Sequence, residues 1–200
     1  MFVKKVEFDV DAHIEKAFPK ALKGEVGFIG RSNVGKSSLL NALFGRKLAK
    51  ISSTPGKTRS LIFFKVNNSY YFVDFPGYGY AKSSKTERNK WERLINNYFN
   101  LNRPRRAIFL LIDSRIPIQL SDLNAFEWLI SIGEKVAIVP TKIDKLKKAE
   151  LLKKIADIEK AFYGADKFLP VSSVTKNGLK ALDAALCEYL TERIEVNLGE

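Results

Sequence analysis

The sequence has one cysteine, one histidine and no long apolar run. Cys187 cannot form a disulfide within the chain, and its apolar, helix-like surroundings predict a buried helix residue. His13 lies in the N-terminal segment, where a surface or capping role is favoured over catalysis. The apolar runs at residues 107–112 and 136–140 are far shorter than the roughly 20 residues that cross a bilayer, and charges interrupt the N-terminus too early for a signal peptide. We therefore expect a cytoplasmic protein with no membrane partner.

Acidic residues are in the minority. The 22 Asp and Glu residues face 34 Lys and Arg residues, which gives a formal net charge of +12. A charge of this size attracts polyanions, and nucleic acid is the leading candidate. The alternative is a solvated basic surface that serves solubility, or ion pairing in a heat-stable protein. The basic residues cluster at positions 46–50, 82–93, 103–106 and 142–154, without a nucleic-acid-binding signature of their own.

Short apolar runs alternate with helix-like segments along the 200 residues. Strands are expected at residues 26–29, 61–66, 70–75, 107–114, 135–142 and 167–171, and helices at residues 36–44, 86–99, 120–132, 147–162 and 178–194. This alternation predicts an α/β fold: a mostly parallel six-stranded sheet with one antiparallel edge strand and helices on both faces. We expect a short N-terminal extension (1–23), a single domain (24–195) and a C-terminal tail (196–200).

A phosphate-binding loop follows the first predicted strand. The residues GRSNVGKS at 30–37 match the pattern G-x-x-x-x-G-K-[ST] and open a predicted helix. The glycines let backbone N–H groups point at the phosphates, Lys36 bridges the β- and γ-phosphates, and the Ser37 hydroxyl ligates Mg²⁺. The loop alone does not distinguish an ATPase, a small-molecule kinase and a GTPase.

The segment TKID at residues 141–144 favours guanine. A carboxylate at Asp144 accepts hydrogen bonds from N1–H and the 2-amino group of guanine, whereas adenine would leave it unpaired at a cost of about 1–3 kcal/mol. The Lys142 stem covers one face of the base, and the small-residue turn at 171–173 admits a backbone N–H to the guanine oxygen. Taken by itself, Asp144 is equally well explained as a helix cap.

Two further segments have the features of switch regions. Asp74 ends a predicted strand and would hold a water on Mg²⁺, and the N–H of Gly77 would sense the γ-phosphate. The polar loop at residues 53–59 supplies Thr58 as a second hydroxyl ligand for Mg²⁺. A loop that is ordered by Mg²⁺ and the γ-phosphate, and released after hydrolysis, acts as a switch.

The segments GRSNVGKSSLLNAL, STPGKTRS, DFPGYGYA, TKID and VSS resemble the nucleotide motifs of the EngB (YihA/YsxC) family of bacterial ribosome-assembly GTPases, within the TrmE-Era-EngA-EngB-septin-like superfamily. The resemblance implies a Ras-like P-loop GTPase domain that depends on Mg²⁺ and hydrolyses GTP slowly to GDP and phosphate. It also implies a nucleotide-dependent switch in large ribosomal subunit assembly, with rRNA and ribosomal proteins as partners and a link to cell division and septation. We expect a monomer off the ribosome.

The motifs together define the expected site. The nucleotide-binding residues are Gly30, Arg31, Ser32, Asn33, Val34, Gly35, Lys36, Ser37, Ser38, Gly56, Lys57, Thr58, Arg59, Ser60, Asp74, Phe75, Pro76, Gly77, Thr141, Lys142, Ile143, Asp144, Val171, Ser172 and Ser173. The expected catalytic residues are Lys36, Thr58, Gly77 and Asn33, and the expected Mg²⁺ ligands are Ser37, Thr58 and, through water, Asp74.

Tyr78 stands where Ras-like enzymes carry the glutamine that orients the attacking water, which predicts low intrinsic activity. Asn33 matches the asparagine that holds K⁺ in related potassium-activated GTPases, with Arg31, Lys57 and Arg59 as rival sources of positive charge. Tyr78 and Tyr80 either stack on RNA bases or pack within their own loop.

Two other classes of protein use the same loop. A metabolic P-loop kinase or ATPase needs an acceptor pocket and a lid, for which the short connections leave little sequence. A GTP-dependent septation or structural protein calls for a coiled coil or an amphipathic anchor, and the sequence shows neither pattern.

Overall fold

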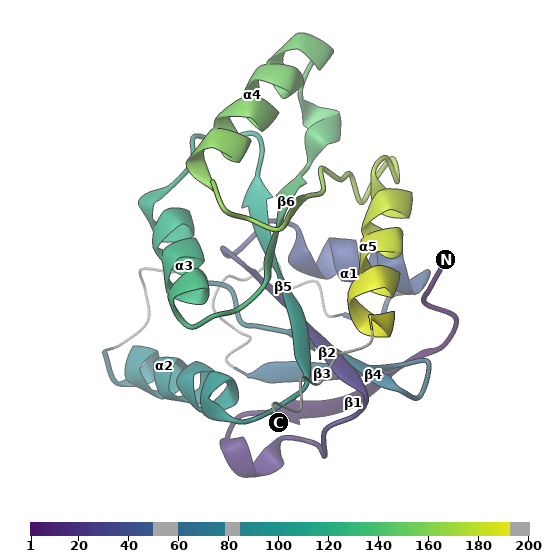
Figure 1. The fold of residues 1–200 in the computed structure, drawn as a ribbon, viewed down its shortest axis with the longest axis vertical. Helices are drawn as coiled ribbons and strands as arrows, with labels where there is room; N and C mark the ends of the chain where they lie inside the picture. The colour runs from purple at the N-terminus through teal and green to yellow at the C-terminus, as the bar shows by residue number, and fades with distance from the viewer. Residues whose placement is uncertain (50–59, 79–84, 193–200) are drawn as a thin grey trace, which may run out of the picture.

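A seven-stranded sheet runs through the part of the chain that the computed structural model describes, residues 1–49, 60–78 and 85–192 (Figure 1). The strands lie in the order β1-β3-β4-β2-β5-β6-β7. Their bounds are β1 (Val6–Ala12), β2 (Gly24–Gly30), β3 (Leu61–Val66), β4 (Tyr70–Asp74), β5 (Arg105–Asp113), β6 (Val136–Thr141) and β7 (Lys167–Phe168). The pairs β4–β2, β2–β5, β5–β6 and β6–β7 are parallel. The pairs β1–β3 and β3–β4, at one edge of the sheet, are antiparallel.

The predicted α/β class, the mostly parallel sheet and the antiparallel edge are confirmed, but the expected number of six strands is wrong. The seventh strand, β1, comes from the segment expected to be an extension, and it pairs with β3 from Val6↔Val66 to Ala12↔Leu61, with a bulge between Phe8 and Val10. Charged residues alternate with apolar ones along β1, as is typical of a half-exposed edge strand. The domain boundaries at residues 24 and 195 stay a prediction.

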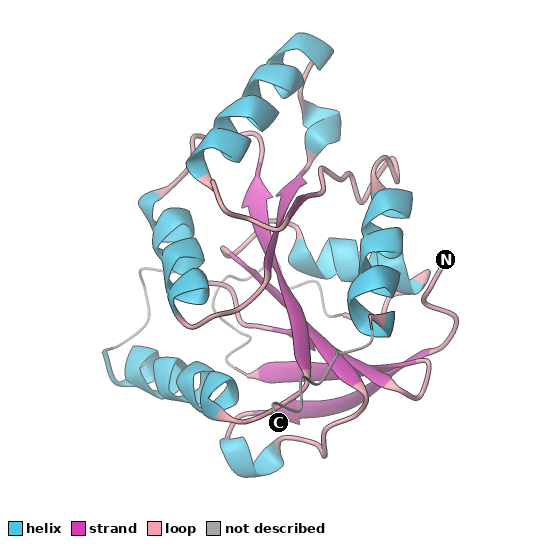
Figure 2. Ribbon diagram, in the orientation of Figure 1, coloured by secondary structure: helices cyan, strands magenta, loops and turns pink. Residues whose placement is uncertain are grey.

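Helices cover both faces of the sheet, as predicted (Figures 1 and 2). One face carries α1 (Lys36–Phe44) and α5 (Leu179–Thr191), and the other carries α2 (Lys85–Asn100), α3 (Leu120–Ser131) and α4 (Lys148–Ala161). Two short 3₁₀ segments, η1 (Glu15–Ala17) and η2 (Ile143–Lys145), complete the described elements. Among the described residues, none of the helices combines the length and the apolar character needed to cross a membrane.

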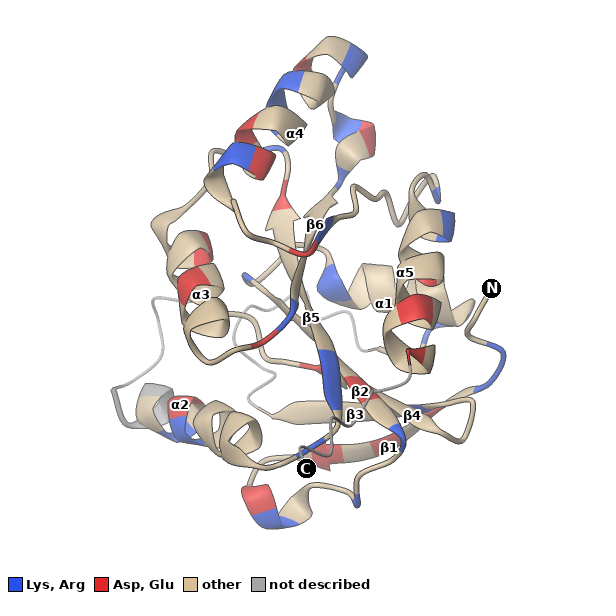
Figure 3. Ribbon diagram, viewed as in Figure 1, with Lys and Arg blue, Asp and Glu red and all other residues tan. Residues whose placement is uncertain are grey.

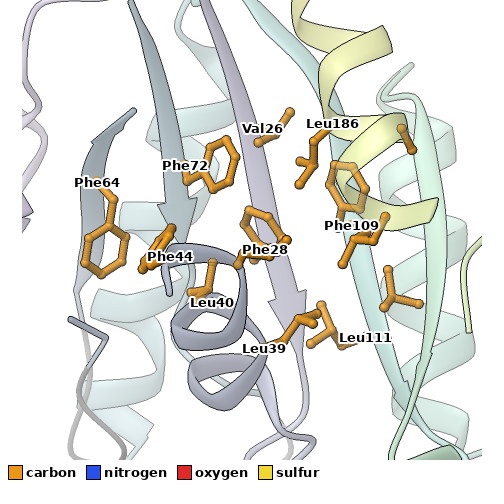
Figure 4. Close-up of a cluster of buried hydrophobic side chains, with 14 of the residues drawn as sticks. Val26, Phe28, Leu39, Leu40, Phe44, Phe64, Phe72, Phe109, Leu111 and Leu186 are labelled. Carbon is orange, nitrogen blue, oxygen red and sulfur yellow. The ribbon is translucent and has the colours of Figure 1, made fainter. Parts of the chain in front are cut away.

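The core under α1 and α5 fixes where α1 begins. Phe28 of β2 lies between Phe72 of β4 and Phe109 of β5, with ring centroids 5.4 and 5.3 Å away, and Leu39 and Leu40 of α1 pack into the same cluster (Figure 4). All five side chains are almost completely buried, and burying a side chain of this size stabilises the fold by about 1.5–3 kcal/mol. The first turn of α1 is thereby held at the carboxyl end of β2.

Two arginines of the 103–106 segment, Arg103 and Arg105, are structural. The Arg103 guanidinium donates to both carboxylate oxygens of Glu25, a fully buried residue that also accepts a 2.8 Å hydrogen bond from the Tyr98 hydroxyl. Arg105 pairs with Glu134 at 2.7 Å and donates to backbone carbonyls at the end of α2. These two arginines are therefore part of the interior rather than of a polyanion-binding surface.

Two smaller predictions have different outcomes. Trp128 packs against the core under α2, α3 and α4, with its ring centroid 5.0 Å from that of Phe99, so its predicted packing role is confirmed. Cys187 lies on α5 as predicted but is only partly buried. The reason is its position beside the buried stripe of the helix, which passes through Leu182, Leu186 and Tyr189.

Candidate nucleotide-binding site

The candidate site lies where the carboxyl ends of β2, β4, β5 and β6 lead into loops. Ligands of open parallel sheets bind outside these strand ends. The phosphate loop follows β2, residues 75–78 follow β4, and η2 follows β6. The three segments, which are far apart in the sequence, contact one another through the hydrogen bonds described below.

Main-chain hydrogen bonds join the phosphate loop to the segment after β4. The Ser32 N–H donates to the Tyr78 carbonyl at 3.1 Å, and the Tyr78 N–H donates to the Gly30 carbonyl at 3.3 Å. A Cβ atom on Gly77 would lie 2.9 Å from the Ser32 nitrogen, so this close approach requires glycine. Asn33 has a φ of 64° in the left-handed region, which asparagine tolerates better than most residues.

Lys36 and Asp74 form an ion pair at the phosphate end of the site. Lys36 lies in the first turn of α1 and Asp74 is the last residue of β4, and their side chains are only 11% and 5% exposed. Burial raises the pKa of the Asp74 carboxyl, and the Lys36 ammonium opposes that rise. The pair places one cation and one carboxylate beside the hydroxyl-bearing residue Ser37 at the start of α1.

A cavity of about 240 Å³ occupies the other end of the site, between the start of α1 and the segments after β6 and β7. Gly35, Thr141, Lys142, Asp144 and Ser173 are among the residues that line it.

The carboxylate of Asp144 is held in place by a serine. Ser172 is fully buried, and its hydroxyl donates to Asp144 at 2.6 Å while accepting a bond from the Thr175 N–H at 3.0 Å. The Ser172 bond is the chief cause that lowers the pKa of Asp144 below its usual value. An ionised carboxylate in a cavity of this kind accepts hydrogen bonds from paired N–H donors, which guanine carries and adenine lacks.

Thr141 and Lys142 connect the cavity to the phosphate loop. The buried Thr141 hydroxyl lies 2.7 Å from the Val34 carbonyl and 3.2 Å from the Ile112 carbonyl. The Lys142 ammonium donates to the Asn33 carbonyl at 2.5 Å. Both residues therefore tie the end of β6 to the phosphate loop.

Comparisons with known proteins agree with this geometry. Residues 25–142 match the family model described as "50S ribosome-binding GTPase". The chain is 52% identical over 194 residues to a probable GTP-binding protein EngB of Thermotoga maritima, and the alignment covers 96% of this chain and all of that one. The chain belongs to the EngB family of GTP-binding proteins. It is a GTPase, and its nucleotides are GTP and GDP.

Solved structures of the same fold include a probable GTP-binding protein engB, with a TM-score of 0.69 and 22% identity over 84% of this chain and all of that chain. They also include Era in complex with MgGDPNP and nucleotides 1506–1542 of 16S ribosomal RNA, with a TM-score of 0.71 and 27% identity over 86% of this chain and 58% of that one. The predicted Ras-like P-loop GTPase fold is thereby confirmed.

The structure brings together most of the residues predicted for the site of this EngB-family chain. The phosphate loop, residues 74–77, TKID and the 171–173 turn all lie around the site just described. Ser60 is buried directly before β3. Four predicted residues lie outside the described part of the chain, namely Gly56, Lys57, Thr58 and Arg59.

The side chain of Phe75, predicted to bind the nucleotide, lies in the hydrophobic core. It is fully buried, with its ring 5.2 Å from Tyr98 and 5.5 Å from Phe99 in the core under α2. Tyr78 packs on the same core, and its hydroxyl donates to Asp122 of α3 at 2.9 Å. Of the two roles considered for Tyr78, packing is the one that these contacts support; Tyr80 lies outside the described residues.

Three residues at or beside the site were not predicted from the sequence: Asp113, Arg115 and Gly178. Asp113 accepts a 2.8 Å hydrogen bond from Lys142, and Arg115 lines the base cavity. Gly178 is the N-cap of α5 with a φ of +76°, and a Cβ there would lie 1.9 Å from the Pro170 carbonyl oxygen. Asp113, like Asp74, is an acidic residue at the end of an apolar strand, which is a signal that the sequence did contain.

Proposed function

We propose that this chain is a nucleotide-dependent switch that acts in the assembly of the large ribosomal subunit and is needed for normal growth and division. The observation that carries the proposal is a net charge of +12 on a chain whose family model is described as "50S ribosome-binding GTPase". The related Era structure contains ribosomal RNA, which supports a ribosomal partner for the family's wider fold group.

At the phosphate end, Lys36 and the N–H groups of the loop would neutralise the charge on the β- and γ-phosphates. Ser37 and, through water, Asp74 would hold Mg²⁺ on the triphosphate. The donor set fits this ion, since Mg²⁺ is commonly held by one or two oxygen ligands, waters and substrate phosphates. When bound, Mg²⁺ would supply charge neutralisation to the departing diphosphate.

Intrinsic hydrolysis is expected to be slow because Tyr78 stands where Ras-like enzymes carry the glutamine that orients the attacking water. The Tyr78 hydroxyl donates to Asp122, and burial raises the pKa of the phenol, so this group remains protonated and engaged. The exposed side chain of Asn33 on the phosphate loop is our candidate ligand for an activating K⁺. Equal turnover in Na⁺ and K⁺ buffers would contradict this part of the proposal.

The contacts of the basic residues favour one surface over others for the proposed contact with RNA. Arg103 and Arg105 are engaged with buried or half-buried carboxylates, which removes them from consideration. Arg46 and Lys47 are exposed after α1, whereas basic and acidic residues alternate along α4 (Figure 3). We therefore favour the loop after α1 over α4 as a phosphate-contacting surface, since affinity for RNA rises with unopposed positive charge.

Co-sedimentation with large ribosomal subunits tests the proposal. Association is expected with a non-hydrolysable GTP analogue and not with GDP. Asp144→Asn supplies an internal control, since an amide at this position favours xanthine, whose 2-oxo group accepts a hydrogen bond. The variant should then associate with the large subunit in the presence of a xanthosine triphosphate analogue and not in the presence of the guanosine triphosphate analogue. Equal association with the GTP analogue and with GDP would refute the switch. An Asp144→Asn variant that still prefers guanine nucleotides would refute the assignment of the base site.

A further inference from the structure

We propose that Asp113 and Arg115 form a clamp on the base cavity: Asp113 fixes the side chains of Lys142 and Arg115, and Arg115 contacts the bound guanosine nucleotide and slows its release. This inference rests on the proposed use of the cavity as the guanine site. Arg115 is thus a nucleotide-binding residue, and Asp113 is a positioning residue that acts through its two cationic partners.

Asp113 uses both of its carboxylate oxygens. It is the last residue of β5 and its side chain is only 10% exposed. One oxygen accepts from the Arg115 main-chain N–H at 3.1 Å and from its Nε at 3.0 Å; the other accepts from the Arg115 Nη2 and from the Lys142 Nζ, both at 2.8 Å. Paired Arg–carboxylate bonds of this kind restrict the orientation of the guanidinium group.

Each partner of Asp113 reaches a different part of the nucleotide site. Lys142 continues to the Asn33 carbonyl in the phosphate loop, while Arg115 lines the base cavity together with Lys142 and Asp144. A guanidinium is planar and weakly hydrated, so it packs well against the flat face of a purine. By holding both Arg115 and Lys142, Asp113 therefore connects the lining of the base cavity to the phosphate loop.

The charge state of Asp113 suits this role. Burial alone would raise the pKa of Asp113, but the hydrogen bonds from Arg115 and Lys142 outweigh it and lower the pKa from 3.8 to about 2. The carboxylate is therefore ionised near neutral pH. Its partners keep a net positive charge beside a nucleotide that carries several negative charges. An Asp–Arg pair that served only to stabilise the turn after β5 would affect unfolding and leave nucleotide release unchanged.

The test measures the dissociation rate of a fluorescent GDP analogue. Arg115→Ala should raise this rate about tenfold, the change expected for loss of one modest contact. Asp113→Ala should raise dissociation further, since it releases Lys142 as well. Arg115→Lys should restore little, because lysine lacks the planar paired geometry. Lys135→Ala, which removes one exposed positive charge at the opposite end of β6, is the matched control and should leave dissociation unchanged.

A double-mutant cycle tests the mechanism. If Arg115 acts only while Asp113 holds it, the double variant should release the nucleotide at the same rate as Asp113→Ala. The proposal would be overturned if the double variant showed the product of the two single-variant increases in dissociation rate. It would also be overturned if Arg115→Ala released the nucleotide at the native rate. Failure of the base-site assignment is recognised separately, because Asp144→Asn would then keep its guanine preference whatever the behaviour of Arg115.

Discussion

Replacing Ser172 by alanine tests whether the buried serine sets the affinity of the base site. The Ser172 hydroxyl lies 2.6 Å from a carboxylate oxygen of Asp144, and a hydrogen bond to a charged group contributes about 1.5–3 kcal/mol. Only the part of this energy that orients Asp144 toward guanine counts in binding, so we expect affinity for GDP to fall about tenfold, or about 1.4 kcal/mol. The variant should also unfold more easily, since the Thr175 N–H loses its acceptor.

The assay is fluorescence titration with a labelled GDP across a range of pH. The native pKa of Asp144 is lowered chiefly by Ser172, so the carboxylate stays ionised as the pH falls. Without the serine, that pKa returns toward its usual value, and affinity should be lost at a higher pH than in the native protein. Ser131→Ala is the control, because its exposed hydroxyl bonds to the Trp128 carbonyl on α3 and Ser131 does not line the cavity. A folded Ser172→Ala variant with native affinity and native pH dependence would refute the reasoning.

Three further substitutions test other parts of the structure. Gly178→Ala would place a methyl group 1.9 Å from the Pro170 carbonyl oxygen at a φ of +76°, and urea unfolding should show a loss of at least about 2 kcal/mol; near-native stability would contradict the geometry. Tyr78→Phe removes the 2.9 Å bond to Asp122 and should cost about 1–3 kcal/mol of stability with GTP hydrolysis almost unchanged; a large change in hydrolysis would show that the hydroxyl takes part. The pKa of Asp113 falls from 3.8 to about 2 on folding, so its stabilisation of about 2 kcal/mol is present above pH 4 and lost as the pH falls through 2; Asp113→Asn should lack this part of the acid sensitivity measured by thermal unfolding.

Much of the fold could be predicted because its strands are buried on both faces and read as continuous apolar runs. Residues 107–112 of β5 are all apolar and β6 is apolar up to Thr141, and both strands were placed to within about two residues, the usual error of a boundary. β1 could not be recognised in the same way, since it lies at the edge and carries Glu7, Asp9 and Asp11 between apolar residues. Its apolar and acidic residues do alternate, but this short alternation differs from the continuous apolar runs by which the other strands were recognised.

The site was predictable wherever a sequence motif states the chemistry directly. Lys36, Asp74 and Asp144 each stand in such a motif, and the structure places them around one site. The roles of Asp113 and Gly178 depend instead on contacts with distant segments, namely the Lys142 ammonium and the Pro170 carbonyl. No spacing rule connects these positions, so only the folded chain reveals them.

The edge strand β1 has a consequence for handling the protein. It covers β3, whose residues Leu61 to Phe64 are apolar and buried. β1 itself carries Glu7, Asp9 and Asp11 at alternate positions and a break in register between Phe8 and Val10, and charges and bulges in an edge strand discourage further pairing. A shortened chain that starts after residue 12 would expose the apolar edge of β3 to other copies of itself. The acidic strand in this basic protein thus acts as a shield against aggregation, and fusion partners or truncations at the amino end should leave it intact.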